Sequence, residues 1–465
     1  MSFEPRTNRP GIFRLWEMHP YYIEALLFGL LVTLCYGFTL GLPFFHDDLP
    51  IMTWLGRNGW YEVWFSQENG YYRPLAFTIY RLGRSLPLGV QQVVLHGVNF
   101  LLLWGSALLL ARILRRFGRD EGESLLAGGL LILFPFLNEA IPWITALSHP
   151  LVVFLTLLAA YAALRAEEEK LGHLWLLSLG ATILAPLAHE SGAICGAIVG
   201  GLVLIRGGFR ARWQTWIMIV LGGFLNVLVV VSRRFIPGAQ TATQLAGLHD
   251  LPQNFFFFLQ GLLYPLTPML SPLIQRGWHD FTVLSVSGGL LALWVLWLIH
   301  KSHRWKWSAL ALWWWGWGAL PAAVALQFPA LFVGPRLYAL SAVGIVALWA
   351  GFITELGKRF GRLWLRRGVW LALTGLLVAQ SLVYHQRQRA LYDTLDNLYD
   401  EVLTLVTEEE HPSPGFVNLP AALTWEERLY PLVTEDVVFV PADYSSLSEF
   451  VEVNCGWRDV DAVTY

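Results

Sequence analysis

The chain has 465 residues, of which 55% are hydrophobic and 14% charged, and its mean hydropathy is +0.49. This composition excludes an ordinary soluble protein, because several apolar runs reach the roughly 18–20 residues that cross a hydrocarbon core about 30 Å thick. The charge is unevenly distributed, with 16 acidic residues and two arginines from Asp393 onward, which argues against nucleic-acid binding.

Eleven apolar segments predict an α-helical polytopic membrane protein. The first is expected to be a retained anchor, because it follows a polar, Arg-bearing stretch and lacks a small-residue cleavage site. A tight hairpin at 188–190 separates the fifth and sixth. The predicted spans are residues 23–43, 92–112, 124–141, 146–164, 171–188, 190–206, 214–232, 281–300, 307–327, 335–355 and 369–384.

The basic residues predict the orientation of these spans in a plasma (inner) membrane. With the N-terminus in the cytoplasm, 20 of the 32 Lys and Arg residues fall in six short cytoplasmic segments. The run 255–270 contains Pro265 and Pro268 and is too short to cross, so we expect an amphipathic or re-entrant segment on the outer surface.

Three parts follow from this topology. Residues 1–22 are a cytoplasmic N-terminus, 23–384 a transmembrane domain with large outer loops at 44–91 and 233–280, and 385–465 a small acidic extracytoplasmic α/β domain. In the last part we expect an amphipathic helix over 385–410, followed by short strands at 416–419 and 437–440.

Unusual polar residues collect at the predicted outer ends of the spans. The span interiors hold almost no ionisable group, with His96 and Asn99 the main polar exceptions, which disfavours an ion-coupled transporter. Five separate hairpins instead place acids, imidazoles or arginines at one depth. These candidate residues are Asp47, Asp48, Tyr72, Arg73, Glu139, His149, His189, Glu190, Arg336 and Tyr338.

Each of these residues alone has a simpler interpretation. The acids would suit a solvated loop, Arg73 and Arg336 could be interfacial snorkelling side chains, and His149 a buried core histidine. Independent solvated loops would not need to agree in depth and face. Their agreement therefore favours a shared site.

Such a set predicts chemistry on a lipid-borne substrate. Carboxylates can act as a general base or hold a divalent cation such as Mg²⁺ or Mn²⁺, and arginines can clamp a phosphate. Gly357-Lys358 is followed by Arg359, so it is not a nucleotide-binding loop. With nucleotides scarce outside the cytoplasm, an activated donor at this face is expected to be a lipid phosphate carrying a sugar.

Residues 20–385 resemble the GT-C glycosyltransferases. They are most similar to the bacterial relatives of the protein O-mannosyltransferases and of the aminoarabinose transferase that modifies lipid A. The resemblance is carried by the acid pair Asp47-Asp48 in the first outer loop, Tyr72-Arg73-Pro74-Leu75 downstream and Arg336-Leu337-Tyr338 at a late span. It implies a GT-C-like bundle and transfer of a sugar from a polyprenyl-phosphate donor to a hydroxyl acceptor, usually with inversion.

The resemblance also implies residue roles. Asp47 would be the base or contact the acceptor, Asp48 would support it or bind a metal with it, and Glu139 stands at the place of a second-loop acid. His189-Glu190 stands where many relatives have Lys-Glu, and the histidine would neutralise the donor phosphate only when protonated. Arg336 is the stronger candidate for that phosphate. The acceptor could be a protein, a lipid or a polysaccharide.

Two other functions remain open from the sequence. A lipid-linked glycan ligase or polymerase would use basic residues of the 233–280 loop, which carries Arg233, Arg234, His249, Arg276 and His279. A flippase or transporter of lipid-linked sugars is the other, and the apolar span interiors weigh against it.

Overall fold

The computed structural model describes residues 20–66, 72–207, 213–232, 235, 246–302, 305–408, 415–416, 422–425, 427–438, 450, 453–454 and 463–464. Each of the eleven predicted spans overlaps a helix. These helices are α2 (Pro20–Tyr36), α6 (Leu88–Arg116), α7 (Glu121–Ile132), α9 (Ser148–Glu169), α10 (Gly172–Ala188), α11 (Cys195–Gly207), α12 (Trp213–Ser232), α15 (Asp280–Ser302), α16 (Trp305–Ala325), α18 (Ala339–Lys358) and α19 (Leu363–Glu408).

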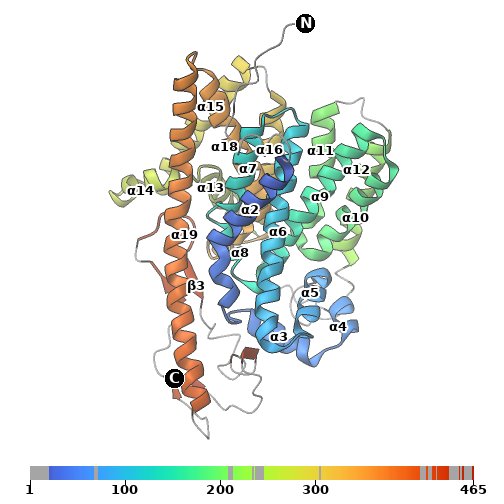
Figure 1. Ribbon diagram of the computed structural model, residues 1–465, viewed down its shortest axis with the longest axis vertical. Coiled ribbons are helices and arrows are strands. Elements are labelled where there is room, and N and C mark those ends of the chain that lie inside the picture. The colour runs from blue at the N-terminus through green and yellow to red at the C-terminus, as the bar shows by residue number, and fades with distance from the viewer. Residues whose placement is uncertain are drawn as a thin grey trace, which may run out of the picture.

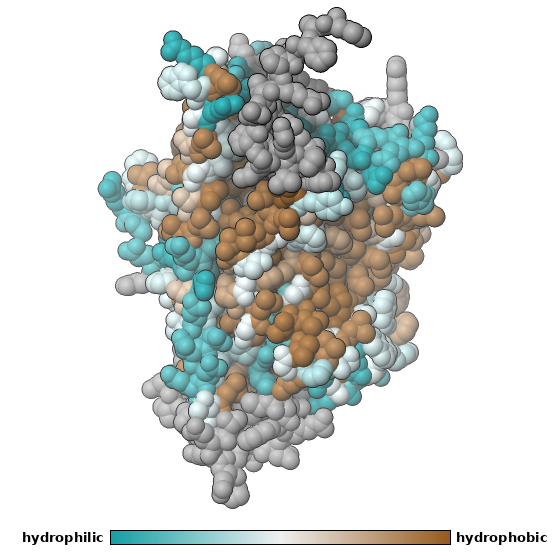
Figure 2. Space-filling model, in the orientation of Figure 1, coloured by the Kyte–Doolittle hydropathy of each residue, from teal (hydrophilic) through white to brown (hydrophobic). Residues whose placement is uncertain are grey.

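The chain is a multi-pass membrane protein. Seven segments within the described residues are long and apolar enough to cross a membrane, and α10 and part of α12 are shorter apolar helices. Leu290, Leu293 and Leu296 on α15 are among the large apolar side chains exposed on the outside of the bundle. Figure 2 shows such side chains as a broad brown band across the middle of one face.

The structure corrects two predicted spans. The span 124–141 is wrong in its second half, because α7 ends at Ile132 and a separate short helix, α8 (Leu137–Ala140), follows Pro135. The span 369–384 and the helix expected over 385–410 are both helical but continuous, and their helix begins six residues earlier, at Leu363. Residues 363–408 form one helix of 46 residues, since no glycine or proline lies between 376 and 408.

The predicted re-entrant run 255–270 is divided between two helices. Helix α13 (Asp250–Leu262) buries Phe257 and Phe258 in the bundle, and α14 (Thr267–Gln275) begins after the turn that contains Pro265. In the C-terminal part, β1 (Gly415–Phe416) pairs in parallel with β4 (Val463–Thr464), and β2 (Ala422–Thr424) pairs antiparallel with β3 (Asp436–Val438). Thus β1 and β3 overlap the two expected strands.

One end of the bundle, the basic end, collects the predicted cytoplasmic loops. It carries Arg115, Arg116, Arg119, Arg206, Lys306 and Lys358. All but Lys306 form ion pairs, with Glu24, Asp120, Glu168 and Glu355 among their partners. Lys306 Nζ donates a hydrogen bond to the Arg206 carbonyl. The short helices α3 (Asp48–Arg57), α4 (Trp60–Phe65) and α5 (Pro74–Arg84) lie at the other end, toward the bottom of Figure 1. The loops therefore alternate between the basic end and the opposite end of the bundle, as the positions of lysine and arginine predict.

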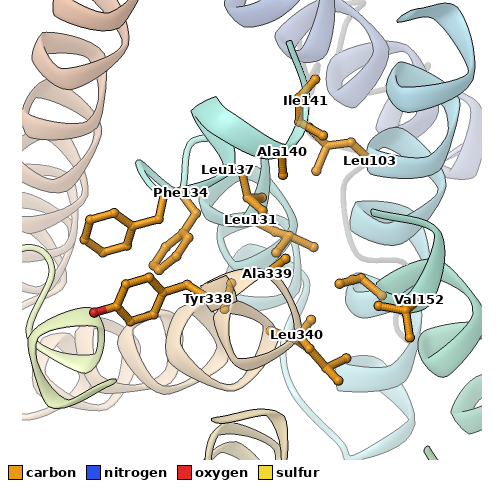
Figure 3. Close-up of a cluster of buried hydrophobic side chains, with 14 of the residues drawn as sticks. Leu103, Leu131, Phe134, Leu137, Ala140, Ile141, Val152, Tyr338, Ala339 and Leu340 are labelled. Carbon is orange, nitrogen blue, oxygen red and sulfur yellow. The ribbon is translucent and has the colours of Figure 1, made fainter. Parts of the chain in front are cut away.

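The core forms where α6, α7, α9 and α18 meet the segment after α7. Figure 3 shows Leu103, Leu131, Val152 and Leu340 from these helices in one cluster with Leu137, and Phe134 beside Tyr338 at its left. All seven side chains are at most 3% exposed. Because lipid is as apolar as these side chains, close packing rather than water exclusion holds the helices together. At Gly344 a Cβ would lie 2.4 Å from the Ala311 carbonyl oxygen, so this close α16–α18 approach requires glycine.

The basic end offers a test of stability. Arg119 is 4% exposed and pairs with Glu123, 0% exposed, and Glu355, 7% exposed. We expect Arg119→Met to cost about 3–5 kcal/mol, because it leaves the buried Glu123 carboxylate without its cation and Glu355 with Lys358 alone. The measurement is thermal unfolding in one detergent. Arg165→Met, which breaks a solvent-exposed pair with Glu169, is the control and should leave Tm nearly unchanged. Equal Tm values for the two variants would contradict the prediction.

Candidate active site

The acid pair Asp47-Asp48 is divided between two environments. His46 has a left-handed backbone conformation (φ +53°), which turns the chain just before the pair. The Asp48 side chain is fully buried, where Oδ1 accepts the Thr145 N–H at 2.8 Å and Oδ2 the Phe45 N–H at 3.3 Å. The Asp47 side chain is 32% exposed, with Oδ1 3.0 Å from His46 Nδ1. Asp48 therefore holds the loop, and Asp47 is the accessible carboxylate.

The two pKa values move in opposite directions. Burial raises the pKa of Asp48 to about 7, and the charge of Asp47 adds to this, against the hydrogen bonds from Thr145 and Phe45. Burial also acts to raise the pKa of Asp47, but the hydrogen bond and charge of His46, followed by the charges of Arg336 and Arg73, hold it below its ordinary value. Asp47 thus lies in the electrostatic field of both candidate arginines.

The centre of the site is the segment between α7 and α9, which includes α8 and the short helix η2 (Ile144–Leu147). The Asn99 side chain donates to the Ile141 carbonyl at 3.0 Å and to that of Trp143 at 3.4 Å. The Tyr80 hydroxyl donates to the Thr145 carbonyl at 2.8 Å, while Asp48 accepts from the N–H of the same residue. Three parts of the chain therefore fix this turn.

Arg73 binds one side of the segment. Its Nε lies 3.1 Å and its Nη2 3.0 Å from Glu190 Oε2, and Nη1 reaches Ser148 Oγ at 3.4 Å. His189, next to Glu190, lies against His149 with the ring centroids 4.3 Å apart. Both imidazoles are nearly buried, and Tyr72, beside Arg73, is 9% exposed.

Arg336 binds the other side. Its backbone N–H donates to Glu139 Oε2 at 2.8 Å, its Nη1 bonds Glu139 Oε1, and its guanidinium lies 4.6 Å from the centroid of the Trp143 ring. Burial raises the pKa of Glu139, against the nearby charge of Arg336. The Tyr338 ring is stacked between the rings of Phe136 and Phe257, and its hydroxyl donates to the Phe257 carbonyl.

The structure thus brings the five predicted groups together around one turn. His46 contacts Trp143 at 4.3 Å between ring centroids, so the acid loop and Arg336 meet at the same indole. Sequence reasoning missed Trp143 and Tyr80, because an aromatic residue near a membrane surface has a simpler interpretation. It also missed the C-terminal part: the Asn454 side chain bonds both the N–H and the carbonyl of Phe44, and the charge of Asp436 acts on Glu139.

The donor set at Asp47-Asp48 does not fit a divalent cation held by both carboxylates. Each Asp48 oxygen accepts a backbone N–H, and the side chain is 0% exposed. Among the described residues there is no group of three or more His, Cys, Asp or Glu side chains that could hold a metal ion. Releasing Asp48 to bind a metal would leave two buried N–H groups unpaired.

The residues of the ligase alternative are less concentrated. His249, Arg276 and His279 are exposed, and Arg233 and Arg234 lie outside the described residues. Of the two polar exceptions within the spans, Asn99 binds the central turn, and His96 is fully buried.

No family model and no curated protein matches the sequence. Among solved structures, the chain is similar to ArnT from Cupriavidus metallidurans bound to undecaprenyl phosphate, with 13% identity over 94% of this chain and 89% of that one and a TM-score of 0.47. It is also similar to the archaeal oligosaccharyltransferase AglB from Archaeoglobus fulgidus in complex with an inhibitory peptide and a dolichol-phosphate. That match has 11% identity over 85% of this chain, spans 59% of the AglB chain, and has a TM-score of 0.47.

The raised pKa of Asp48 predicts a pH-dependent stability. Between the ordinary pKa of 3.8 and about 7, folded Asp48 holds a proton that the unfolded chain releases, so its contribution to stability falls as pH rises through this range. We expect the Tm of the wild type, relative to Asp48→Asn, to fall from pH 5 to pH 8. Asp47→Asn is the control, because a lowered pKa acts only at more acidic pH. Parallel Tm curves for wild type and Asp48→Asn would refute the assignment.

Proposed function

We propose that the protein is a GT-C-type glycosyltransferase that moves a sugar from a polyprenyl-phosphate donor to a hydroxyl acceptor. The observation that carries the proposal is that one accessible carboxylate, Asp47, lies within the electrostatic influence of two arginines from distant parts of the chain, Arg73 and Arg336. A carboxylate can serve as the base for a hydroxyl, and arginines suit a leaving phosphate. An apolar bundle beneath them suits a substrate with a polyprenyl tail.

The proposed reaction is a single displacement with inversion. Asp47 accepts the proton of the acceptor hydroxyl while its oxygen attacks the anomeric carbon of the donor. The bond between that carbon and the phosphate oxygen breaks, and its electron pair stays on the phosphate. Arg336, supported by Arg73, stabilises the charge that grows on this leaving group. The products are a glycoside and a polyprenyl phosphate.

Both arginines are paired with glutamates before any donor arrives. Glu190 holds Arg73, and Glu139 holds Arg336 through a side-chain and a backbone contact. Each carboxylate occupies donor groups that a phosphate would use. We infer that donor binding replaces or shares these contacts, so the glutamates weaken phosphate binding while they keep the guanidinium groups oriented.

We place this site on the extracytoplasmic side of the membrane. The support is the enrichment of lysine and arginine at the opposite, basic end, which is the end expected in the cytoplasm. With this orientation the C-terminal part also lies outside, next to the first loop that Asn454 contacts.

Asp47→Asn tests the base. We expect it to lower sugar transfer at least about 100-fold, since an amide cannot accept the proton, with an unchanged Tm. Purified protein in nanodiscs would receive several polyprenyl-phosphate sugars with candidate protein, lipid and glycan acceptors, and mass spectrometry would detect new glycosides. Asp393→Asn, on an exposed part of α19, is the control. Full activity of Asp47→Asn would refute the assignment, and movement of labelled lipid between leaflets without a new glycosidic bond would favour a flippase.

Glu190→Gln tests the competition for Arg73. Loss of the carboxylate charge is expected to tighten binding of undecaprenyl phosphate about 3- to 10-fold, because a partly exposed ion pair of about 1 kcal/mol no longer competes with the ligand. Binding would be titrated in nanodiscs by native mass spectrometry. Glu169→Gln, at the basic end, provides the matched control. Weaker binding in Glu190→Gln would show that the carboxylate supports the phosphate site rather than competes with it.

A further inference from the structure

Trp143 stands at the junction of the two halves of the site. It follows α8 in the central turn, and its side chain is 5% exposed. Its carbonyl accepts from Asn99, and two residues later Thr145 is held by both Asp48 and Tyr80. The backbone that carries the indole is therefore held from α6, α3 and α5.

The indole ring makes two contacts of different kinds. The Arg336 guanidinium lies 4.6 Å from its centroid, within the range of a cation–π interaction. The His46 ring meets it at 4.3 Å with the planes inclined by 64°, an edge-on arrangement. The Trp143 ring therefore contacts both the Arg336 guanidinium and His46, the residue that hydrogen-bonds Asp47.

The choice of tryptophan carries a cost. Within the described part of the chain, its buried Nε1–H has no hydrogen-bond acceptor. An unpaired buried donor costs about 1–3 kcal/mol in general, and phenylalanine would fill the core without it. Tryptophan offers the strongest π face for a cation, so the ring is expected to serve Arg336 rather than packing alone.

We propose that Trp143 is a positioning residue, whose ring orients the Arg336 guanidinium toward the phosphate of a polyprenyl-phosphate ligand and keeps it in register with His46 and Asp47. The inference rests on the proposed function in naming the ligand, and it adds a residue that acts through Arg336. Glu139 holds Arg336 by an ion pair, and the Trp143 ring restricts the orientation of the Arg336 guanidinium plane. A misaligned guanidinium would keep its charge but lose paired hydrogen bonds to phosphate oxygens.

The test compares Trp143→Phe, which keeps a weaker π face, with Trp143→Leu, which removes it. We expect undecaprenyl phosphate to bind about 3-fold more weakly to the Phe variant and about 10- to 30-fold more weakly to the Leu variant, the range of a desolvated cation–π contact. The matched controls are Trp307→Phe and Trp307→Leu, since Trp307 lies under Arg119 at the basic end with its Nε1–H bonded to Ala347. Their binding should equal that of wild type.

A double-mutant cycle with Arg336→Gln isolates the contact. In the Arg336→Gln background, Trp143→Leu should weaken binding no further, and a second cycle read from thermal unfolding should show coupling of the same pair without ligand. Equal binding by wild type and Trp143→Leu, or an additive cycle in both measurements, would overturn the proposal. Failure of the proposed function is separate: the wild type would then bind or unfold as described but form no glycosidic bond.

Discussion

The site depends on the hydrogen bond from the Thr145 N–H to the buried Asp48 carboxylate. This bond joins the first loop to the turn between α7 and α9, and Tyr80 and Asn99 hold the same turn from two further elements. Glu139 and Trp143 lie on this segment, and Ser148 and His149 begin α9 directly after it. The positions of Glu139, Trp143, Ser148 and His149 relative to Asp47 therefore depend in part on a carboxylate that itself has no exposed surface.

This arrangement assigns different duties to two adjacent aspartates. The Asp48 carboxylate has no exposed surface, so a substrate hydroxyl cannot reach it to give up a proton. Asp47 is accessible and keeps its charge because His46, Arg336 and Arg73 favour the ionised form. A base with a lowered pKa is a weak one, so the proposed reaction relies on the arginines to stabilise the leaving phosphate as much as on Asp47 to remove the proton.

Much of this arrangement could be predicted from the sequence because membrane helices have a strong one-dimensional signal. Hydropathy located the helices, and the repeated placement of polar residues at one end predicted that Asp47, Arg73, Glu139, Glu190 and Arg336 would meet. The division of the acid pair could not be predicted, since it depends on a backbone N–H 97 positions away. Trp143 was missed for a related reason: only three-dimensional contacts distinguish it from the other 22 tryptophans.

Arg119 at the basic end and the two arginines of the candidate site differ in burial, and this difference suits different duties. At the basic end Arg119 is 4% exposed and contacts two glutamates, so its guanidinium is enclosed with its partners and no substrate could reach it. At the other end Arg73 and Arg336 are 17% and 26% exposed, each faces one glutamate, and Asp47 beside them is 32% exposed. Charges that are oriented but still accessible suit transient binding of an anion, whereas fully enclosed pairs suit stability. The same type of ion pair therefore stabilises the bundle at Arg119 and orients the accessible arginines of the candidate site at Arg73 and Arg336.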